Sequence, residues 1–307
     1  MIYTLTLNPS LDYILQLDDL QTGRLNRVDK TFKFPGGKGI NVSQVLKTLG
    51  IDSVTLGLIG GFTGDRLCQL LHKKDIRTDF IQVEEDTRIN VKIKAQEETE
   101  LNAKGPTCSQ EKYQALTDQI KKLTTNDMLI LSGSIPSTLP DTTYEQLAGI
   151  CYEQGTPFVV DAEGDLLKRV LPYKPFLIKP NHHELGELFD TKVTTAEEAI
   201  PYGRKLIQDG AQHVLVSLAG NGAVLISKDK TFITSAPRGN IVGSVGAGDS
   251  MVAGFIAGYH ASHSTYEAFK LSVAAGSATA FSNGLATEKM IHSLLSDIKP
   301  VSRGDSL

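Results

Sequence analysis

Residues 128–160 read MLILSGSIPSTLPDTTYEQLAGICYEQGTPFVV, and the order of apolar and helical segments in this stretch decides the fold. Residues 128–131 and 158–160 are short apolar runs with the length and composition of buried strands. Residues 143–154, between them, have the length of a helix and are followed by Gly155. A strand, a helix and a strand in this order are typical of a parallel sheet covered by helices.

The same alternation extends in both directions from this stretch. Further apolar runs occupy residues 176–178 and 214–216, and further candidate helices occupy residues 41–49, 65–73, 110–123 and 196–208. The sequence therefore predicts an α/β fold with a largely parallel sheet. No repeat, low-complexity segment or linker rich in Pro, Gly and Ser divides the chain, so we expect a single domain over residues 1–307.

Two stretches interrupt the alternation with strands that have no helix between them. Residues 13–17 with 27–34, and later residues 87–94, read as strands with one polar face. We expect them to form a small sheet that stands off the main domain. Strands inserted in this way often cover a binding site, so segments 11–34 and 87–103 are the predicted lid.

The composition argues against several classes of protein. A chain of 307 residues that is 40% hydrophobic and 21% charged has an ordinary globular composition. Its formal net charge of -4 gives no general attraction to nucleic acid or to an anionic membrane, and no apolar stretch is long enough to span a bilayer. We therefore expect neither partner. Cys68, Cys108 and Cys151 lie far apart without a C-x-x-C pair, which predicts reduced thiols in a cytoplasmic protein.

The strongest candidate site is Val245-Gly246-Ala247-Gly248-Asp249-Ser250, which precedes an apolar run rich in small residues. Small residues let backbone amides point outward. The start of a helix also offers unpaired N–H groups and a positive dipole end to an anion such as a transferring phosphoryl group. Asp249 would be the carboxylate beside that anion. A helix N-cap after a glycine turn explains Asp249 equally well.

Two further motifs place hydrogen-bonding groups at the start of a helix and the end of a strand. In Gly36-Gly37-Lys38-Gly39-Ile40-Asn41, the glycines allow close approach of a ligand, Lys38 adds a charge, and Asn41 adds a donor and an acceptor. Asn8-Pro9-Ser10-Leu11-Asp12 follows the first strand, where ligands of open α/β sheets gather, and Asp12 can accept bonds from sugar hydroxyls. Taken singly, each motif is explained as well by a plain turn.

A fourth motif, Lys179-Pro180-Asn181-His182-His183-Glu184, again follows an apolar run. Asn181 and Glu184 are spaced to meet in a first helical turn, which suits a hydrated Mg²⁺ or, alternatively, a capping box. Neighbouring histidines diverge on a helix and no third ligand is evident, so a zinc site is not expected. The P-loop and G-x-G-x-x-G fingerprints are both absent from the sequence, which argues against P-loop kinases and NAD dehydrogenases.

Together and in this order, the four motifs resemble those of the PfkB branch of the ribokinase family: N-P-x-x-D, G-G-K-G-x-N, K-P-N-x-x-E and G-A-G-D. The resemblance covers nearly the whole chain. Residues 57–64 (GLIGGFTG), 87–90 (TRIN) and 131–136 (LSGSIP) look like further elements of the family. Within the branch, residues 34–43 and 245–255 are most similar to bacterial 1-phosphofructokinases.

The resemblance implies a three-layer α/β/α ribokinase-like core with a small β-sheet lid, ATP in a shallow groove and a sugar phosphate under the lid. It implies Asp249 as the base, with Gly246, Ala247 and Gly248 as the anion hole. The residues implied to face the sugar are Asp12, Gly37, Lys38, Asn41 and Ser134. Those implied to act on the nucleotide are Lys179, Asn181, Ser217, Gly220 and Gly222, with Glu184 at Mg²⁺.

Two further expectations come from relatives. Ala219 stands where many of them carry glycine, and its methyl group is expected to narrow the nucleotide groove. The lids of relatives form dimer contacts, so the resemblance also implies a homodimer through the lid.

For the reaction, the resemblance implies transfer of the ATP γ-phosphate to the C6 hydroxyl of fructose 1-phosphate. Arg24, Arg27 and Arg88, in the predicted lid strands, are candidates to grip the phosphate of the acceptor, although exposed strands also carry arginines for solubility. Alternatives within the family are tagatose-6-phosphate kinase and 6-phosphofructokinase. A non-catalytic sugar-phosphate sensor is the alternative from another class, but a sensor does not need Asp249 and its glycine turn.

Overall fold

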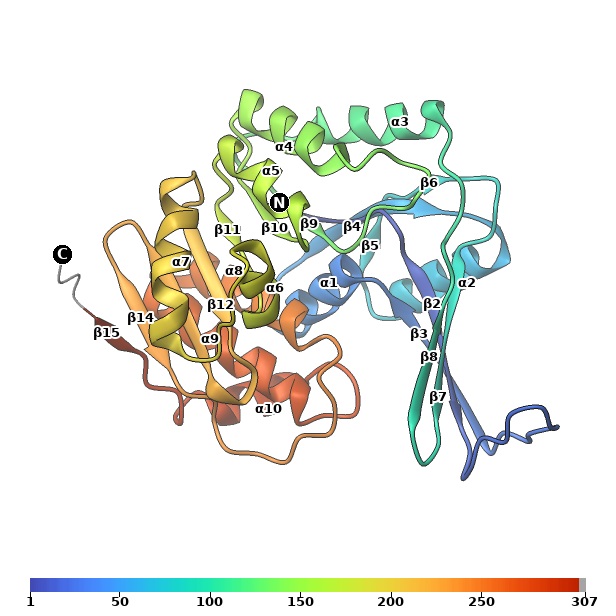
Figure 1. The fold of residues 1–307 in the computed structure, drawn as a ribbon. Helices are drawn as coiled ribbons and strands as arrows, with labels where there is room; N and C mark the ends of the chain where they lie inside the picture. The colour runs from blue at the N-terminus through green and yellow to red at the C-terminus, as the bar shows by residue number, and fades with distance from the viewer. Residues whose placement is uncertain (304–307) are drawn as a thin grey trace.

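A sheet of 11 strands forms the middle layer of the computed structural model, which describes residues 1–303 (Figure 1). The strand order is β15-β14-β13-β12-β11-β10-β9-β1-β4-β5, and β6 pairs with β4. All pairings from β12 to β5 and β6 are parallel, whereas β13, β14 and β15 extend the edge in antiparallel fashion. The sequence prediction of a largely parallel sheet is therefore confirmed.

The bounds of the elements follow in chain order. The strands of this sheet are β1 (Ile2–Thr6), β4 (Ser53–Ile59), β5 (Arg77–Thr78), β6 (Ile81–Gln82), β9 (Met128–Ser132), β10 (Phe158–Asp161), β11 (Leu177–Ile178), β12 (His213–Ser217), β13 (Ala223–Ser227), β14 (Thr231–Thr234) and β15 (Val301–Arg303). The helices are α1 (Lys38–Thr48), α2 (Gly61–His72), α3 (Gln110–Ile120), α4 (Thr143–Gln154), α5 (Asp165–Val170), α6 (His182–Leu188), α7 (Ala196–Gln208), α8 (Ala247–Ser262), α9 (Thr265–Ala280) and α10 (Glu288–Leu294). Two 3₁₀ turns are η1 (Leu171–Tyr173) and η2 (Ala219–Asn221).

Side chains that alternate along each strand divide the helices between the two faces of the sheet. Leu129 and Leu131 of β9 belong to the apolar cluster that also contains residues of α3, α4 and α7. Ile130, between them, belongs to the cluster that contains residues of α1, α8, α9 and α10. Because successive strand side chains point to opposite faces, one short apolar run contributes to both cores. This gives the three-layer α/β/α core that was predicted.

Two helices begin earlier than the sequence predicted. Helix α1 begins at Lys38 rather than residue 41, and α2 begins at Gly61 rather than residue 65. Glycine is a weak helix former, so the sequence does not favour it in a first turn. In α1 a tertiary contact compensates, because the Ile40 N–H donates to Thr6 Oγ1 of β1 at 3.1 Å.

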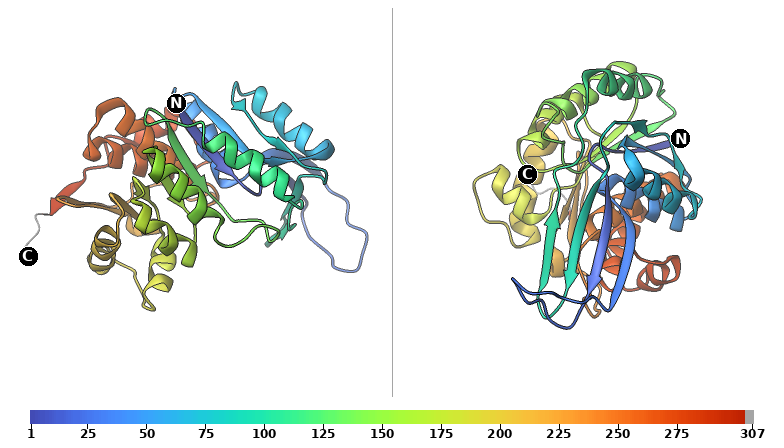
Figure 2. Two further views of the ribbon diagram at one scale, coloured as in Figure 1. Left: turned by 90° about the horizontal axis from the view of Figure 1, so that it is seen from above. Right: turned by 90° about the vertical axis from the view of Figure 1, so that its right-hand side faces the viewer.

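A second sheet of four strands, in the order β3-β2-β7-β8, stands off the main body (Figures 1 and 2). Its strands are β2 (Ser10–Gln16), β3 (Lys30–Gly36), β7 (Arg88–Lys94) and β8 (Glu98–Asn102). They come from the two segments in which the sequence predicted a small sheet. In the register of β2 with β3 and β7, Asp12 lies opposite both Phe34 and Asn90.

The loop between β2 and β3 corrects one prediction. Arg24 and Arg27 were placed in strands, but both are exposed in the loop of residues 17–29. The side chain of Asn26 bonds to both backbone groups of Gln21 at 2.8 Å. Such side-chain bonds compete with a β-ladder for the backbone, which accounts for the loop.

Helix α8 is enclosed by the rest of the protein, and every residue from Asp249 to Gly258 is buried. Its close approach to α9 depends on glycine, because a Cβ atom on Gly254 would lie 2.6 Å from the Leu271 carbonyl oxygen. This packing fixes the position of the N-terminal turn of α8. No helix within residues 1–303 has the combined length and apolarity that a membrane span requires.

Two glycines in helices should respond to alanine with opposite signs. At Gly149 of α4 an added Cβ meets ordinary contacts, the nearest at 3.4 Å, so Gly149→Ala should stabilise the protein by about 0.5–1 kcal/mol. Gly254→Ala should destabilise it by roughly 1–3 kcal/mol because the new atom overlaps backbone. Urea unfolding of both variants measures this. A gain of stability in Gly254→Ala would contradict the proposed packing of α8 on α9.

Candidate active site

A cavity of about 1080 Å³ opens between the small sheet and the carboxyl ends of the parallel strands. Residues at or just after these strand ends supply one wall: Thr6, Asn8, Gly133, Asp161, Lys179 and Ser217. The small sheet supplies the opposite wall with residues such as Asp12, Arg88 and Asn90. Ligand sites usually measure about 300–1000 Å³, so this cavity has room for two substrates side by side.

Most of the residues predicted from the sequence meet in this cavity. Those that line it are Asp12, Gly37, Lys38, Asn41, Arg88, Ser134, Lys179, Asn181, Glu184, Ser217, Gly220, Gly222, Gly246, Ala247, Gly248 and Asp249. Arg24 and Arg27 do not line it, because the loop that carries them lies beyond the end of β2.

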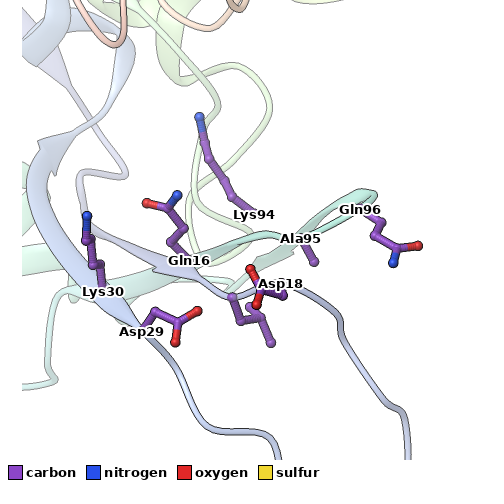
Figure 3. A pocket seen from close by; sticks show the side chains of 8 residues that line it. Gln16, Asp18, Asp29, Lys30, Lys94, Ala95 and Gln96 are labelled. Atoms are coloured by element: carbon purple, nitrogen blue, oxygen red, sulfur yellow. The ribbon is translucent and has the colours of Figure 1, made fainter.

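A smaller cavity of about 490 Å³ lies at the far end of the small sheet (Figure 3). It is lined by the ends of β2, β3 and β7 and the turns beside them, including Gln16, Lys30 and Lys94. None of the four motifs contributes to its lining. The motifs therefore identify the larger cavity as the candidate active site.

Asp249 is a buried carboxylate in the first turn of α8, with 5% of its surface exposed. Its Oδ2 accepts a hydrogen bond of 2.8 Å from Asn41 Nδ2. Burial, together with the charge of Asp161, raises the pKa of Asp249 to about 6, although Asn41, Lys38 and Lys179 act in the opposite direction. A carboxyl with this pKa is ionised at neutral pH and is basic enough to accept a proton.

The alternative that Asp249 is only a helix cap is wrong. The N-cap of α8 is Gly246, at φ +80°, and no side chain caps this helix. The Ala247 N–H donates to the Ser244 carbonyl at 3.1 Å, so it is engaged within the turn. The N–H groups of Gly248 and Asp249 have no backbone acceptor within residues 1–303. They are the amides that remain for an anion.

Asp161, at the end of β10, is a site residue that the sequence analysis missed. It is 1% exposed, and its Oδ1 lies 3.3 Å from Lys179 Nζ and 3.8 Å from Lys38 Nζ. Burial alone would lower the pKa of Lys38, but the carboxylates of Asp161, Asp249, Glu163 and Glu184 together raise it, so Lys38 is charged. The available signal was its position directly after an apolar strand, which had also identified Lys179.

Buried polar atoms without hydrogen-bond partners gather in this cavity. Within residues 1–303, such atoms are Asn8 Oδ1, Asn90 Oδ1, Ser132 Oγ, both carboxylate oxygens of Asp161, His182 Nδ1 and Gln119 Oε1. The residues of five of these seven atoms line the cavity. Unpaired buried polar atoms are costly, so their concentration at one place indicates that a polar ligand completes the site.

The small sheet presents polar and basic side chains to the cavity. Asp12 Oδ1 accepts bonds from Ser10 Oγ at 2.7 Å and Asn90 Nδ2 at 3.3 Å. Arg88 uses Nε and Nη1 to bond the carbonyl oxygens of Asn8 and Ala103, at 3.2 and 3.1 Å. Lys92 shares this face with Arg88 and Asn90, and its Nζ lies 3.4 Å from Glu100 Oε1. The sequence analysis assigned no role to Asn90 or Lys92.

Asn181 and Glu184 form a capping box at the start of α6. Asn181 Oδ1 accepts from the backbone N–H groups of His183 and Glu184, and Glu184 Oε2 accepts from the Asn181 N–H at 2.7 Å. The capping box that the sequence allowed for Asn181 and Glu184 is therefore confirmed. Both side chains also line the cavity, so capping fixes them where they face a ligand.

The neighbouring histidines His182 and His183 line the cavity. Within residues 1–303, no three His, Cys, Asp or Glu side chains are grouped as ligands of a metal ion. Asp161 and Glu184 offer carboxylate oxygens, the ligands that a hydrated Mg²⁺ prefers. Neither oxygen of Asp161 makes a hydrogen bond within the described residues, although Lys179 Nζ lies 3.3 Å from Oδ1.

The turn after β12 brings two predicted segments together. Ser217 forms a bridge with Asn181, and its N–H donates to the Pro180 carbonyl at 3.2 Å. Ala219 follows with φ +49°, a left-handed conformation that glycine adopts at lower cost. This explains why glycine suits the position better in a turn that borders the cavity.

The charges of this cavity are arranged for a polyanionic ligand beside one proton acceptor, which is the requirement of a kinase. The chain belongs to the pfkB family of carbohydrate kinases, whose model matches residues 5–290. It is 50% identical to a 1-phosphofructokinase of Bacillus subtilis over 299 residues, which cover 97% of this chain and 99% of the relative. A D-tagatose-1-phosphate kinase of Bacillus licheniformis is 37% identical, with coverage of 97% and 99%.

A solved structure extends this comparison to the fold. Phosphofructokinase-2 from Escherichia coli, in complex with substrates and products, superposes with a TM-score of 0.92 at 27% identity. The superposition covers 97% of this chain and 99% of that chain. The family, the ribokinase-like fold and the assignment as a sugar kinase, all predicted from the sequence, are confirmed.

We predict that the activity depends on the ionised form of Asp249. The rate should fall as pH drops below about 6, because protonation removes the acceptor. Asp249→Asn keeps the bond partner of Asn41 but not the base, and kcat should fall by about 10²–10⁴-fold with little change in substrate binding. A pH profile of kcat/KM and the kinetics of the variant test both statements. A near-normal kcat would exclude Asp249 as the base.

Proposed function

We propose that this protein transfers the γ-phosphoryl group of ATP to the C6 hydroxyl of fructose 1-phosphate, which gives fructose 1,6-bisphosphate and ADP. The position of Asp249 carries the proposal. Its buried carboxylate lies in an uncapped first helical turn, lines a polar cavity and is influenced by the charges of Lys38 and Lys179. The identity of 50% to a relative named 1-phosphofructokinase supports the choice of acceptor.

In the proposed reaction, the C6 oxygen attacks the γ-phosphorus and its proton passes to Asp249. The bond between the γ-phosphorus and the bridging oxygen breaks, and ADP leaves with the electron pair. Asn41 holds Oδ2 of Asp249, so the other oxygen, Oδ1, is the acceptor for the hydroxyl proton. The N–H groups of Gly248 and Asp249, with the ammonium groups of Lys38 and Lys179, stabilise charge on the transferring group.

Asp161 holds these two lysines in place. Without it, the ammonium groups of the partly exposed Lys38 and the buried Lys179 would lose a shared counter-charge. With it, both lysines lie at ion-pair distance from Asp161 Oδ1 and line the cavity, and Lys38 also lies 3.4 Å from Glu163. We propose that the incoming phosphates take over part of this pairing when ATP binds.

Bound Mg²⁺ would neutralise charge on the phosphates of ATP. Glu184 would hold it, with Asp161 nearby in the same cavity. Burial is the main cause of the raised pKa of Glu184, and Lys179 acts against it. A cation at this position would favour the ionised form of Glu184.

The phosphate of the acceptor would bind to the small sheet, which acts as a lid over the sugar. Arg88 still has N–H groups beyond the two that bond carbonyl oxygens, and Lys92 extends the basic row on the same face. Tagatose 1-phosphate is a second candidate acceptor, because it shares the C1 phosphate and a relative at 37% identity is named for it. A non-catalytic sensor is disfavoured because it has no use for a buried base.

The opposite face of the small sheet supports a homodimer. Leu15, Val91, Ile93 and Leu101 alternate with the cavity-facing side chains, so they share this outer face, and Leu101 is 57% exposed. A second copy of the same sheet would cover these apolar side chains. Light scattering in solution decides between one chain and two.

A panel of acceptors with ATP and Mg²⁺ tests the proposed function. Fructose 1-phosphate should have the highest kcat/KM, ahead of tagatose 1-phosphate, fructose 6-phosphate, tagatose 6-phosphate and free fructose. Arg88→Lys and Lys92→Ala should each raise KM for fructose 1-phosphate by about tenfold or more, because one charge-assisted bond contributes roughly 1.5–3 kcal/mol, without affecting KM for ATP. Lys94→Ala, on the same face but in the distant cavity, is the control. Faster turnover of free fructose would reject a phosphorylated acceptor.

The metal assignment predicts a separate effect on magnesium. Glu184→Gln keeps an oxygen that can accept the Asn181 N–H, so the helix cap survives while the charge is lost. The Mg²⁺ concentration for half-maximal rate should rise about tenfold or more, whereas KM for fructose 1-phosphate should stay the same. Titration with Mg²⁺ at saturating ATP measures it. An unshifted titration would leave Glu184 as a capping residue alone.

A further inference from the structure

A chain of polar side chains leads from Asp249 to a lysine at the surface. Lys74, which follows α2, donates to Gln44 Oε1 at 2.6 Å. Gln44 Nε2 faces Asn41 Oδ1 at 3.4 Å and the Pro35 carbonyl at 3.5 Å. Asn41 Nδ2 in turn donates to Asp249 Oδ2 at 2.8 Å. Gln44 and Asn41 lie on one face of α1, three residues apart, and Gln44 is 7% exposed.

The order of donors and acceptors in this chain has only one consistent direction. An ammonium group donates and cannot accept, so Lys74 requires the oxygen of the Gln44 amide. The amide nitrogen of Gln44 must then donate to the side-chain oxygen of Asn41. The side-chain nitrogen of Asn41 therefore points toward Asp249 and donates to it. If the Asn41 amide were reversed, its oxygen would face a carboxylate, and two acceptors would repel each other.

We propose that Gln44 and Lys74 are positioning residues of the phosphoryl transfer, which set the Asn41 amide so that it donates to Asp249. This inference rests on the proposed role of Asp249 as the base. Asn41 donates to one oxygen of the Asp249 carboxylate, Oδ2, so the other oxygen remains free to accept the proton of the acceptor hydroxyl. Lys74 and Gln44 do not touch substrate; they act through Asn41.

The charges around Asp249 determine how its pKa responds when this hydrogen-bonded chain of side chains is broken. Asp161 faces it from the end of β10, Lys38 from α1 and Lys179 from the segment after β11. Asp161 raises the pKa of Asp249, whereas the Asn41 hydrogen bond and both lysines lower it. Loss of the Asn41 bond therefore raises the pKa of Asp249, so the base becomes protonated at a higher pH.

The first test is Gln44→Met, which keeps the length of the side chain and removes both ends of the amide. The acid limb of the kcat/KM profile should move to higher pH by about half a unit to one unit. At pH 6.5 kcat should fall about 1.5- to 3-fold, as a shift of this size from about 6 requires, while KM for ATP stays the same. If only the urea stability changes, with kcat and the acid limb as in the unmodified protein, Gln44 merely joins α1 to its surroundings and the proposal is overturned.

A reversed pair provides the rescue. In the double variant Gln44→Arg with Lys74→Glu, the guanidinium donates to Asn41 and the new carboxylate accepts from the guanidinium. The acid limb should return toward its original position. If the double variant behaves like Gln44→Met, the direction of the chain is not what matters and the proposal fails.

A milder variant covers the case in which Gln44→Met does not fold. Lys74 lies at the surface, so Lys74→Met should fold, and it should shift the acid limb in the same direction by a smaller amount. Lys73→Met, one residue earlier and also exposed, is the matched control and should shift nothing. An identical profile for both lysine variants would remove Lys74 from the proposal.

The unmodified protein and Asp249→Asn are measured alongside these variants. If the unmodified protein phosphorylates no sugar phosphate, or if Asp249→Asn remains active, the proposed function or its base has failed. If both behave as expected and the Gln44 variants are normal, only the positioning role has failed.

Discussion

The two buried carboxylates Asp161 and Asp249 impose the constraint on which the site depends. Burial in one cavity removes most of their hydration, and the charge of Asp161 adds to the rise in the pKa of Asp249. Lys38 and Lys179 oppose this rise in the pKa of Asp249, and their ammonium groups lie 3.8 and 3.3 Å from Asp161. The lysines and Asp161 are paired before any ligand arrives, so phosphates can enter by exchanging partners with Asp161.

The layered fold makes this arrangement available. Asp161 and Lys179 come from the ends of neighbouring parallel strands, so their side chains reach the same edge of the sheet. Lys38 and Asp249 lie in the first turns of α1 and α8. These two helices cover the same face of the sheet and pack against each other within one apolar cluster. The charges therefore have fixed positions because the backbone that carries them is part of the core.

The start of α8 lacks a side-chain cap, and this absence leaves backbone N–H groups available for a ligand. Stable helices usually satisfy their first N–H groups with a side-chain cap. Here Gly246 provides no cap, and only the Ala247 amide is engaged within the turn. The amides of Gly248 and Asp249 are kept available beside the base. Burial of α8 against α9 stabilises the helix in place of a cap.

Much of this protein was determined by its sequence alone. The apolar runs indicated the layered α/β core, since the spacing of apolar residues in a strand or helix is a local property of the sequence. Most residues of the four motifs line the cavity, because strand ends and helix starts, where the motifs lie, are local features of the sequence. The first turns of α1 and α2 escaped prediction, because glycine there is stabilised by contacts such as Thr6 with Ile40, far apart in the chain.

Only the tertiary structure decided which groups meet. Asp161 carries no local sign of its two lysines, which are separated from it by 123 and 18 residues. Arg24 and Arg27 were candidates beside Arg88, yet they lie in a loop that Asn26 bonds to Gln21 and do not line the cavity. The link from Lys74 through Gln44 and Asn41 to Asp249 likewise joins separate helices. Residue types are written in the sequence, but hydrogen bonds and ion pairs depend on distances that only folding sets.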